Sequence, residues 1–312
     1  MQVIEGLELI AAPPQGVVLT IGNFDGVHRG HQKLFSLVVE EARSAGGTPV
    51  LLTFKPHPSK VLHPGRHLPL LSTREQRYRL FAAAGIELAV VHPFTAEFSR
   101  TGAEEFIELL VLPRLRPRKI LLGTPFRFGH DRRGDVALLQ ALGARHGFEA
   151  SGVEVVDEDG ATISSSRIRK ALLGGDVASG ARMLGRPFEI EGRVVHGDGR
   201  GRSLAFPTAN LEVENELIPA DGVYVTRLRV GDGLHDAVAN IGLRPTFDRT
   251  GRAIEAHLLG FQGDLYDQPV GLLFYERLRE ERRFPNPEAL VDQIKKDVAR
   301  ARAVLAATPP GT

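Results

Sequence analysis

Residues 17–31 read VVLTIGNFDGVHRGH, an apolar run that leads into a glycine-rich turn and two histidines. The run and the amphipathic residues Gln32–Ala45 after it predict a strand, a tight turn and a helix. This geometry points backbone N–H groups and the positive end of a helix dipole at whatever lies above the turn. Such a site favours phosphate, and we expect the turn residues Gly22, Asn23 and Phe24 to contact it.

The two histidines carry the first chemical signal. His28 and His31 are three residues apart and are expected on one face of the first helical turn. There they can donate hydrogen bonds to phosphate oxygens as negative charge builds on a leaving pyrophosphate. With Gly30 between them they resemble the HxGH signature of nucleotidyltransferases, which move an adenylyl group. Two plain surface histidines are the alternative, but strand, glycines and helix occur in the order that the signature needs.

Composition limits the class of protein. A length of 312 residues suggests two domains, and 42% hydrophobic and 25% charged residues are ordinary for a soluble enzyme. A net charge of +1 gives no support to bulk binding of nucleic acid or of an anionic membrane. The absence of cysteine excludes disulfides and thiolate catalysis. No apolar run is long enough to span a bilayer, and Met1–Ala12 does not read as a signal peptide, so we expect a cytoplasmic location.

The first half of the chain alternates short apolar runs with helical stretches. This alternation predicts a Rossmann-like α/β domain, with a parallel sheet covered on both faces. The expected strands are Val17–Ile21, Pro49–Phe54, Leu88–Val91, Lys119–Leu122 and Phe148–Val156. The expected helices are Gln32–Ala45, Thr73–Ala84, Ala103–Leu110, Asp135–His146, Ser165–Leu172 and Asp176–Leu184.

Beyond Gly185 the pattern changes to strand-like runs separated by Gly, Pro and Asp turns. This is typical of an all-β barrel or sandwich. A final amphipathic stretch, Pro287–Leu305, is expected to form a helix that packs on it. The predicted domains are therefore residues 1–184 and 185–312. The expected strands are Phe188–Val195, Gly222–Val230, Asp236–Ile241, Ile254–Leu259 and Val270–Leu278.

A second candidate phosphate element lies in Ile163–Arg169. Ser164 and Ser165 stand at a helix start, where their hydroxyls can cap free N–H groups or bind phosphate oxygens. Arg169 adds a planar cation that suits a triphosphate. A plain N-cap followed by a basic helix face remains the alternative.

Two loops that follow expected strands complete the first set of candidates. His57 lies in Thr53–Pro58, which by itself reads as a structural turn. Phe126, Arg127 and Phe128 follow the fourth expected strand, and α/β sheets bind ligands at the carboxyl ends of their strands. The two rings with an arginine could hold a planar phosphorylated ligand, or the loop could be simply solvated. We assign these four residues to a ligand loop.

The β region carries its own candidates. Gly197–Arg202 is a Gly- and Arg-rich loop that could follow phosphates with backbone N–H groups. Thr208 and Asn210 are two residues apart, so they point to one side of a strand and suit a Mg²⁺ that keeps phosphate oxygens as ligands. Glu255 interrupts an apolar strand and is a candidate base for an alcohol nucleophile, although a solvent-facing Glu is the alternative. No GxxxxGK[ST] occurs, so a kinase here would not be a P-loop enzyme.

Taken in order, these motifs resemble the prokaryotic bifunctional riboflavin kinase/FAD synthetase family, from about Val17 to about Arg302. The N-terminal motifs are GNFDGVHRGH, TFKPHP, FRFG and ISSSRIR; the C-terminal ones include LGRPF, GDGRGRSLAFPTAN, NIGLRPTF, IEAH and DLY. The resemblance implies an N-terminal adenylyltransferase that makes FAD from FMN and ATP, and a six-stranded barrel that phosphorylates riboflavin to FMN. It implies ATP as co-substrate and Mg²⁺ as cofactor, with no nucleic-acid or membrane partner. Flavoenzymes that receive the product are possible partners but cannot be read from the sequence.

The resemblance also assigns roles. In the adenylyltransferase, His28 and His31 match the adenylylation histidines, and the second nucleotide motif is matched by Ser164, Ser165 and Arg169. In the kinase, Thr208 and Asn210 match the Mg²⁺–nucleotide pair, and Glu255 matches the catalytic base. Two other functions stay open. One is a monofunctional riboflavin kinase with a degenerate N-terminal nucleotide-binding domain, and the other is a flavin or nucleotide sensor without turnover.

Four positions depart from the family pattern. Pro125 stands where Asp or Asn is usual before FRFG, and proline offers neither a side-chain polar group nor an N–H. One ligand contact of the adenylylation site is therefore in question. Ser166 replaces a usual Thr and keeps the hydroxyl. Ala205 replaces a Gly in the kinase loop, and Gly260 replaces a common Asp at an expected turn.

Overall fold

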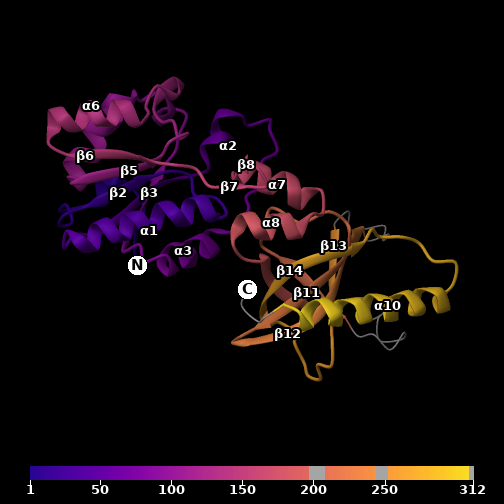
Figure 1. The fold of residues 1–312 in the computed structure, drawn as a ribbon. Helices are drawn as coiled ribbons and strands as arrows, with labels where there is room; N and C mark the ends of the chain where they lie inside the picture. Colours follow the sequence, from indigo (N-terminus) through magenta and orange to yellow (C-terminus); the bar gives the residue numbers. More distant parts are fainter. Residues whose placement is uncertain (197–207, 244–251, 309–312) are drawn as a thin grey trace. The chain divides into compact units, whose positions relative to one another are not determined.

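The computed structural model describes residues 1–196, 208–243 and 252–308 (Figure 1). It divides into two compact units, residues 1–69 with 74–163, and residues 70–73 with 164–312. The predicted boundary after Leu184 lies later than this division. The reason is that α7 (Ser165–Leu173) packs on α8 (Val177–Leu184), and α8 packs on strands of the second unit.

The first unit is built on a parallel sheet, as predicted, with six strands where five were expected. The strands are β1 (Gln2–Ile4), β2 (Val18–Ile21), β3 (Pro49–Lys55), β4 (Leu88–Pro93), β5 (Lys119–Gly123) and β6 (Glu149–Val153). Their order is β1-β4-β3-β2-β5-β6, and every pair is parallel. The chain thus proceeds outward from β2 in one direction and from β5 in the other. The switch point between β2 and β5 is where such sheets bind ligands, at the carboxyl ends of the strands.

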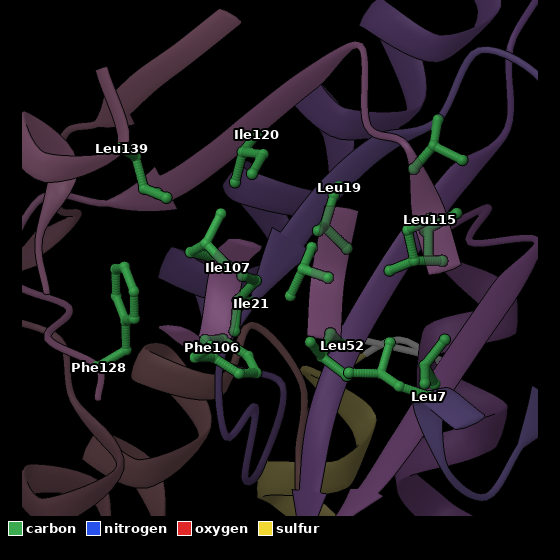
Figure 2. Packing of buried hydrophobic residues seen from close by; sticks show 14 of the residues in the cluster. Leu7, Leu19, Ile21, Leu52, Phe106, Ile107, Leu115, Ile120, Phe128 and Leu139 are labelled. Atoms are coloured by element: carbon green, nitrogen blue, oxygen red, sulfur yellow. The ribbon is translucent and has the colours of Figure 1, made fainter. Parts of the chain in front are cut away.

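Helices cover both faces of this sheet because each central strand is apolar on both sides. In β2, Val18 faces the core beneath α1 (Arg29–Ser44) and α3 (Arg74–Ala83). Leu19 faces the opposite core, where the helical segment 103–115 and α6 (Val136–His146) pack. Figure 2 shows part of this second core, in which Leu19, Ile107 and Ile120 belong to one cluster of buried side chains. Burying each such side chain stabilises the fold by about 1.5–3 kcal/mol.

Short elements complete the first unit. They are 3₁₀ turns at Leu7–Leu9, Phe98–Arg100 and His130–Arg132, helix α2 (Pro58–Leu62), and the pieces of segment 103–115, namely α4 (Ala103–Glu105), a π-helical stretch at Phe106–Val111 and α5 (Leu112–Leu115). A small antiparallel hairpin, β7 (Asp157–Glu158) and β8 (Ala161–Thr162), follows β6.

The second unit is a closed, fully antiparallel barrel of six strands, which confirms the expected β-barrel. The strands are β9 (Phe188–Val195), β10 (Ala209–Val213), β11 (Gly222–Val230), β12 (Gly233–Leu243), β13 (Arg252–Leu258) and β14 (Pro269–Arg279). Tyr224, Leu228 and Phe274 are fully buried. The predicted terminal helix is α10 (Pro287–Ala306), and its Ala301 and Leu305 pack outside the barrel on Val223, Val225 and Val238.

Candidate active sites

The loop after β2 is held in an unusual backbone conformation. Phe24, Gly26 and Val27 have φ angles of 50°, 81° and 43°. The left-handed region is costly for a β-branched residue such as Val27, by about 1–3 kcal/mol, and such strain is found where function demands a fixed geometry. The loop is fastened by the Gln32 side-chain amide, which donates to the Val27 carbonyl at 2.8 Å.

The two histidines stand at the beginning of α1 and face each other. His28 occupies the N-cap position, and its ring stacks on that of His31 with centroids 3.6 Å apart and planes 20° apart. Gly30 permits this arrangement, because a Cβ there would lie only 3.2 Å from the His28 ring. The structure therefore places both imidazoles at a helix N-terminus beside the switch point of the sheet.

His31 is in an environment that disfavours its charged form. Burial holds the pKa of the His31 imidazole well below its usual value, and the neighbouring His28 lowers the pKa further. The ring packs edge-on against Phe24, with centroids 5.2 Å apart. Its Nδ1 is buried and forms no hydrogen bond with any residue in the described part of the chain. At neutral pH this imidazole is neutral, and it keeps hydrogen-bonding capacity for a ligand.

The loop after β5 lies next to β2 at the same edge of the sheet. Phe128 is buried in the core against Phe106, with ring centroids 6.1 Å apart. The Arg127 guanidinium donates to the carbonyls of Thr124 and Phe126, at 3.0 and 2.9 Å. Phe126 is half-buried, and Arg127 is exposed. Of the three predicted ligand-loop residues here, Phe128 belongs to the core, whereas Phe126 and Arg127 keep exposure to solvent. Their contact with a ligand stays a prediction.

The remaining predicted residues of the adenylylation site have visible local roles. The Nδ1 of His57 accepts the backbone N–H of Ser59 at 3.2 Å and caps α2, next to a cis Lys55–Pro56 bond. Ser164 is the N-cap of α7 and accepts the N–H of Arg167 at 3.3 Å. Arg169 is buried in the same helix. Because Ser164, Ser165 and Arg169 belong to the second compact unit, their grouping with the histidines stays a prediction.

In the barrel, strand register brings the predicted kinase residues together. Asn210 of β10 lies opposite Glu255 of β13, and Glu255 lies opposite Asn240 of β12. Directly opposed residues share a face, with Cβ atoms about 4.5–5.5 Å apart. Asn240 in turn lies opposite Val223, which packs beneath α10. This row of an amide, a carboxylate and an amide therefore lies on the outer face of the barrel.

A pocket of about 340 Å³ adjoins Thr208, two residues before Asn210. Its lining includes Thr208, Ala209, Phe261 and Tyr266. Tyr266 is stacked on His196, with ring centroids 3.8 Å apart. Neither of these two rings was predicted as a site residue, although Tyr266 stands in the DLY motif. A planar group could enter such a pocket against aromatic walls.

Some predicted features lie outside the described residues. These are the Gly- and Arg-rich loop Gly197–Arg202, Ala205 and the segment Arg244–Phe247. Gly260 has a φ of 82° with open space around its Cβ position, so glycine suits this turn. Among the described residues, no three His, Asp or Glu side chains gather as a metal site. Within the same residues, no helix has the length and apolar character needed to cross a bilayer.

Comparison with known proteins assigns the chain to a protein family. A family model described as FAD synthetase matches residues 10–167, and one described as riboflavin kinase matches residues 184–305. Two relatives named bifunctional riboflavin kinase/FMN adenylyltransferase are similar along their whole length. The protein from Pseudomonas fluorescens is 38% identical over 98% of both chains, and that from Escherichia coli K12 is 37% identical over 99% of this chain and 100% of its own.

A solved structure has the same overall fold. It is titled a macrolide-efflux protein from Streptococcus pneumoniae, is 30% identical, covers 97% of this chain and 99% of its own, and superposes with a TM-score of 0.88. That title describes the pneumococcal protein, whereas both family models and the curated relatives point to flavin chemistry. This chain therefore belongs to the family of bifunctional riboflavin kinase/FMN adenylyltransferases.

Proposed function

We propose that this enzyme makes FAD from riboflavin in two ATP-dependent steps, and that the residues described above carry them out. The chain has a riboflavin kinase domain and an FAD synthetase domain, so ATP is its co-substrate. The observation that carries the residue assignment is the stacked pair His28–His31 at the N-terminus of α1, beside the switch point of a parallel sheet. We keep the functional division at Leu184, which the start of the kinase match supports.

In the first unit, the FMN phosphate attacks the α-phosphorus of ATP. A phosphorus–oxygen bond forms to FMN as the bond to pyrophosphate breaks, and no base is needed because the attacking phosphate is already ionised. His28 and His31 donate hydrogen bonds to the leaving pyrophosphate, assisted by the dipole of α1. The approaching phosphates favour the protonated imidazole and so oppose the effect of burial on His31. Ser164, Ser165 and Arg169 are proposed to hold the triphosphate.

In the barrel, Glu255 accepts the proton of the ribityl 5′-hydroxyl while that oxygen attacks the γ-phosphorus of ATP. The bond from this phosphorus to the β–γ bridging oxygen breaks as the new bond forms, and ADP leaves. Thr208 and Asn210 are proposed to hold Mg²⁺, since a hydroxyl and an amide oxygen near a carboxylate are the hard ligands that this ion accepts. When bound, the ion neutralises charge on the ATP phosphates. The pocket beside Thr208, with Phe261 and Tyr266 in its wall, is proposed to receive the nucleotide. Catalysis then depends on positioning and on charge neutralisation.

The two other functions are not favoured. A monofunctional kinase would need a degenerate first unit, yet both histidines are in place at the helix start. A sensor without turnover would not need a carboxylate in register with Asn210. The curated relatives named for both activities favour the bifunctional enzyme. The cytoplasmic location expected from the sequence stays a prediction.

One assay tests the proposal. The purified protein is incubated with riboflavin, ATP and Mg²⁺, and the flavins are separated by chromatography. We expect FMN to appear first and FAD to follow. FMN without FAD, even with FMN and ATP at saturation, would support the monofunctional kinase. Neither product would support the sensor.

A further inference from the structure

Two cations on α1 hold the chain that leads out of the parallel sheet. Arg29 and Lys33 are four residues apart and so lie on one face of the helix. The Arg29 guanidinium forms an ion pair with the Glu158 carboxylate through Nη1 and Oε2. The Lys33 ammonium donates to the carbonyl of Glu154 at 3.1 Å. Both contacts reach the same stretch of chain, residues 154–163.

Residues 154–163 form what we call the hairpin segment. Its strands β7 and β8 are joined by Asp159 and Gly160, whose φ angles of 53° and 71° are those of a tight two-residue hairpin turn. The N–H of Ile163 donates to the Val156 carbonyl at 2.9 Å and closes the base of the hairpin. The next residue in the chain is Ser164. The hairpin segment thus leads directly into the second nucleotide motif.

The position of Arg29 is informative because it is electrostatically unfavourable for the helix. It is the first residue of α1, where the helix dipole opposes a positive charge. It also lies between His28 and His31 in the sequence. Glu158 supplies the opposite charge from a partly buried position, with 18% of its side chain exposed against 41% for Arg29. This pairing fastens the histidine motif to the hairpin segment.

We propose that Arg29 is a positioning residue for adenylyl transfer and that it acts through Glu158. The ion pair fixes the hairpin segment against the start of α1, and so restrains the helix N-terminus at which His28 and His31 stand. This inference rests on the proposed adenylyltransferase function of the first unit. The competing role is direct binding of phosphate by Arg29, in which case Glu158 would compete with the nucleotide for the guanidinium.

The experiment compares Arg29→Gln, Glu158→Gln, the double variant of both, and the exchange Arg29→Glu/Glu158→Arg. Glu154→Gln is the matched control, because it removes one carboxylate from the same segment, while Lys33 of α1 is bound by the backbone carbonyl of Glu154, which the substitution keeps. Each protein is assayed for FAD synthesis, with ATP and FMN varied separately, and for riboflavin phosphorylation. Hydrogen–deuterium exchange is followed in peptides that cover residues 154–163.

We expect each single glutamine variant to lower kcat/KM of FAD synthesis by about two- to fivefold, the range for one partly exposed ion pair. The double variant should be no worse than either single one, because the two residues act as a pair. The charge-swapped variant Arg29→Glu/Glu158→Arg should recover most of the loss. Hydrogen–deuterium exchange in the hairpin segment should be faster in the single variants, while riboflavin phosphorylation and the Glu154→Gln control stay at the wild-type level.

Other outcomes overturn the inference in distinct ways. Opposite effects on the KM for ATP, raised by Arg29→Gln and lowered by Glu158→Gln, would mean that Arg29 binds phosphate directly. A parallel fall of both activities would mean a general loss of stability. Wild-type FAD synthesis in every variant would overturn the positioning role while leaving the proposed function intact. No FAD from the parent protein would overturn both.

Discussion

The two sites of this chain are built on opposite principles. In the first unit, the histidines stand at the start of one helix, and a loop with three positive φ angles holds them there. In the barrel, Asn210, Glu255 and Asn240 are aligned by the register of three antiparallel strands. In the first site, a few residues with strained backbone angles hold the functional side chains in position. In the second site, many backbone hydrogen bonds between strands do so. Single substitutions should therefore separate the two activities cleanly.

The largest effect is expected in the barrel. Glu255→Gln keeps the shape of the side chain but cannot accept a proton. Phosphorylation of riboflavin should fall by about 10²–10⁴-fold, the usual contribution of a general base. FAD synthesis from added FMN should persist, because Glu255 lies in the other site. Steady-state rates with each substrate measure this, and a kinase that still turns over at the parent rate would rule out Glu255 as the base.

The converse separation is expected from the histidines. His28→Ala and His31→Ala each remove a donor that is used mainly in the transition state, which costs about 10²–10³-fold in rate. Formation of FAD should fall by that factor while FMN production is unchanged. Chromatography of the products from riboflavin and ATP would show FMN accumulating. An undiminished yield of FAD would refute the assigned role.

The strained loop offers a smaller and purely steric test. A Cβ on Gly22 would lie 2.8 Å from the ring of Phe24, and that ring is packed against His31 and Phe35. Because the ring has little room to retreat, Gly22→Ala should destabilise the first unit by about 1–3 kcal/mol. Gly65→Ala, where nothing lies within 4 Å, is the control. Urea denaturation of both variants measures the difference, and equal stability would show that the loop yields easily.

The pKa of His31 makes stability depend on pH. Since burial lowers this pKa in the folded state, the unfolded chain binds the proton more readily below about pH 6.5. Stability is then fully present above that pH and falls as the pH drops toward the folded pKa, by up to about 1.4 kcal/mol per pH unit for one group. His31→Gln should flatten this slope below about pH 6.5. His92 also has a pKa lowered by burial and should keep part of the slope in the variant.

The sequence predicted most elements because their patterns are local. Phe188–Val195 and Gly222–Val230 form strands with the expected bounds, since alternating apolar residues between turns specify them. Strand β1 was missed because only three residues, Gln2–Ile4, pair with Leu88–Val90 far along the chain. The hairpin at Asp157–Thr162 was also missed, although Asp159-Gly160 is a strong two-residue turn signal.

The bounds of one helix and the geometry of the sites differ in how far a local pattern predicts them. The helix expected over Ala103–Leu110 continues to Leu115, because a π-helical stretch precedes Pro113 and the proline falls in the first turn of α5. The closeness of His28 and His31 followed from helical periodicity, which is local. The register between Asn210 and Glu255 does not follow from a local pattern, since it depends on how separate strands pair. The cap that His57 forms on α2 was consistent with the structural turn that TFKPHP suggests.

The smallest predicted effect concerns Pro125, which is exposed in the turn where the N–H of Phe126 donates to the Gly123 carbonyl. Proline fixes φ and supplies no donor, so this loop has one possible ligand hydrogen bond fewer than a loop with Asp or Asn. One such bond is worth about 0.5–1.5 kcal/mol, or roughly three- to tenfold in affinity. Adenylylation should therefore persist with a raised requirement for FMN or ATP, and Pro125→Asp should lower that requirement while riboflavin phosphorylation stays unchanged. Steady-state kinetics with FMN and ATP varied separately decide this. A parent protein that makes no FAD, with synthesis restored only by the Asp variant, would instead identify the first unit as degenerate and leave the barrel as the single working site.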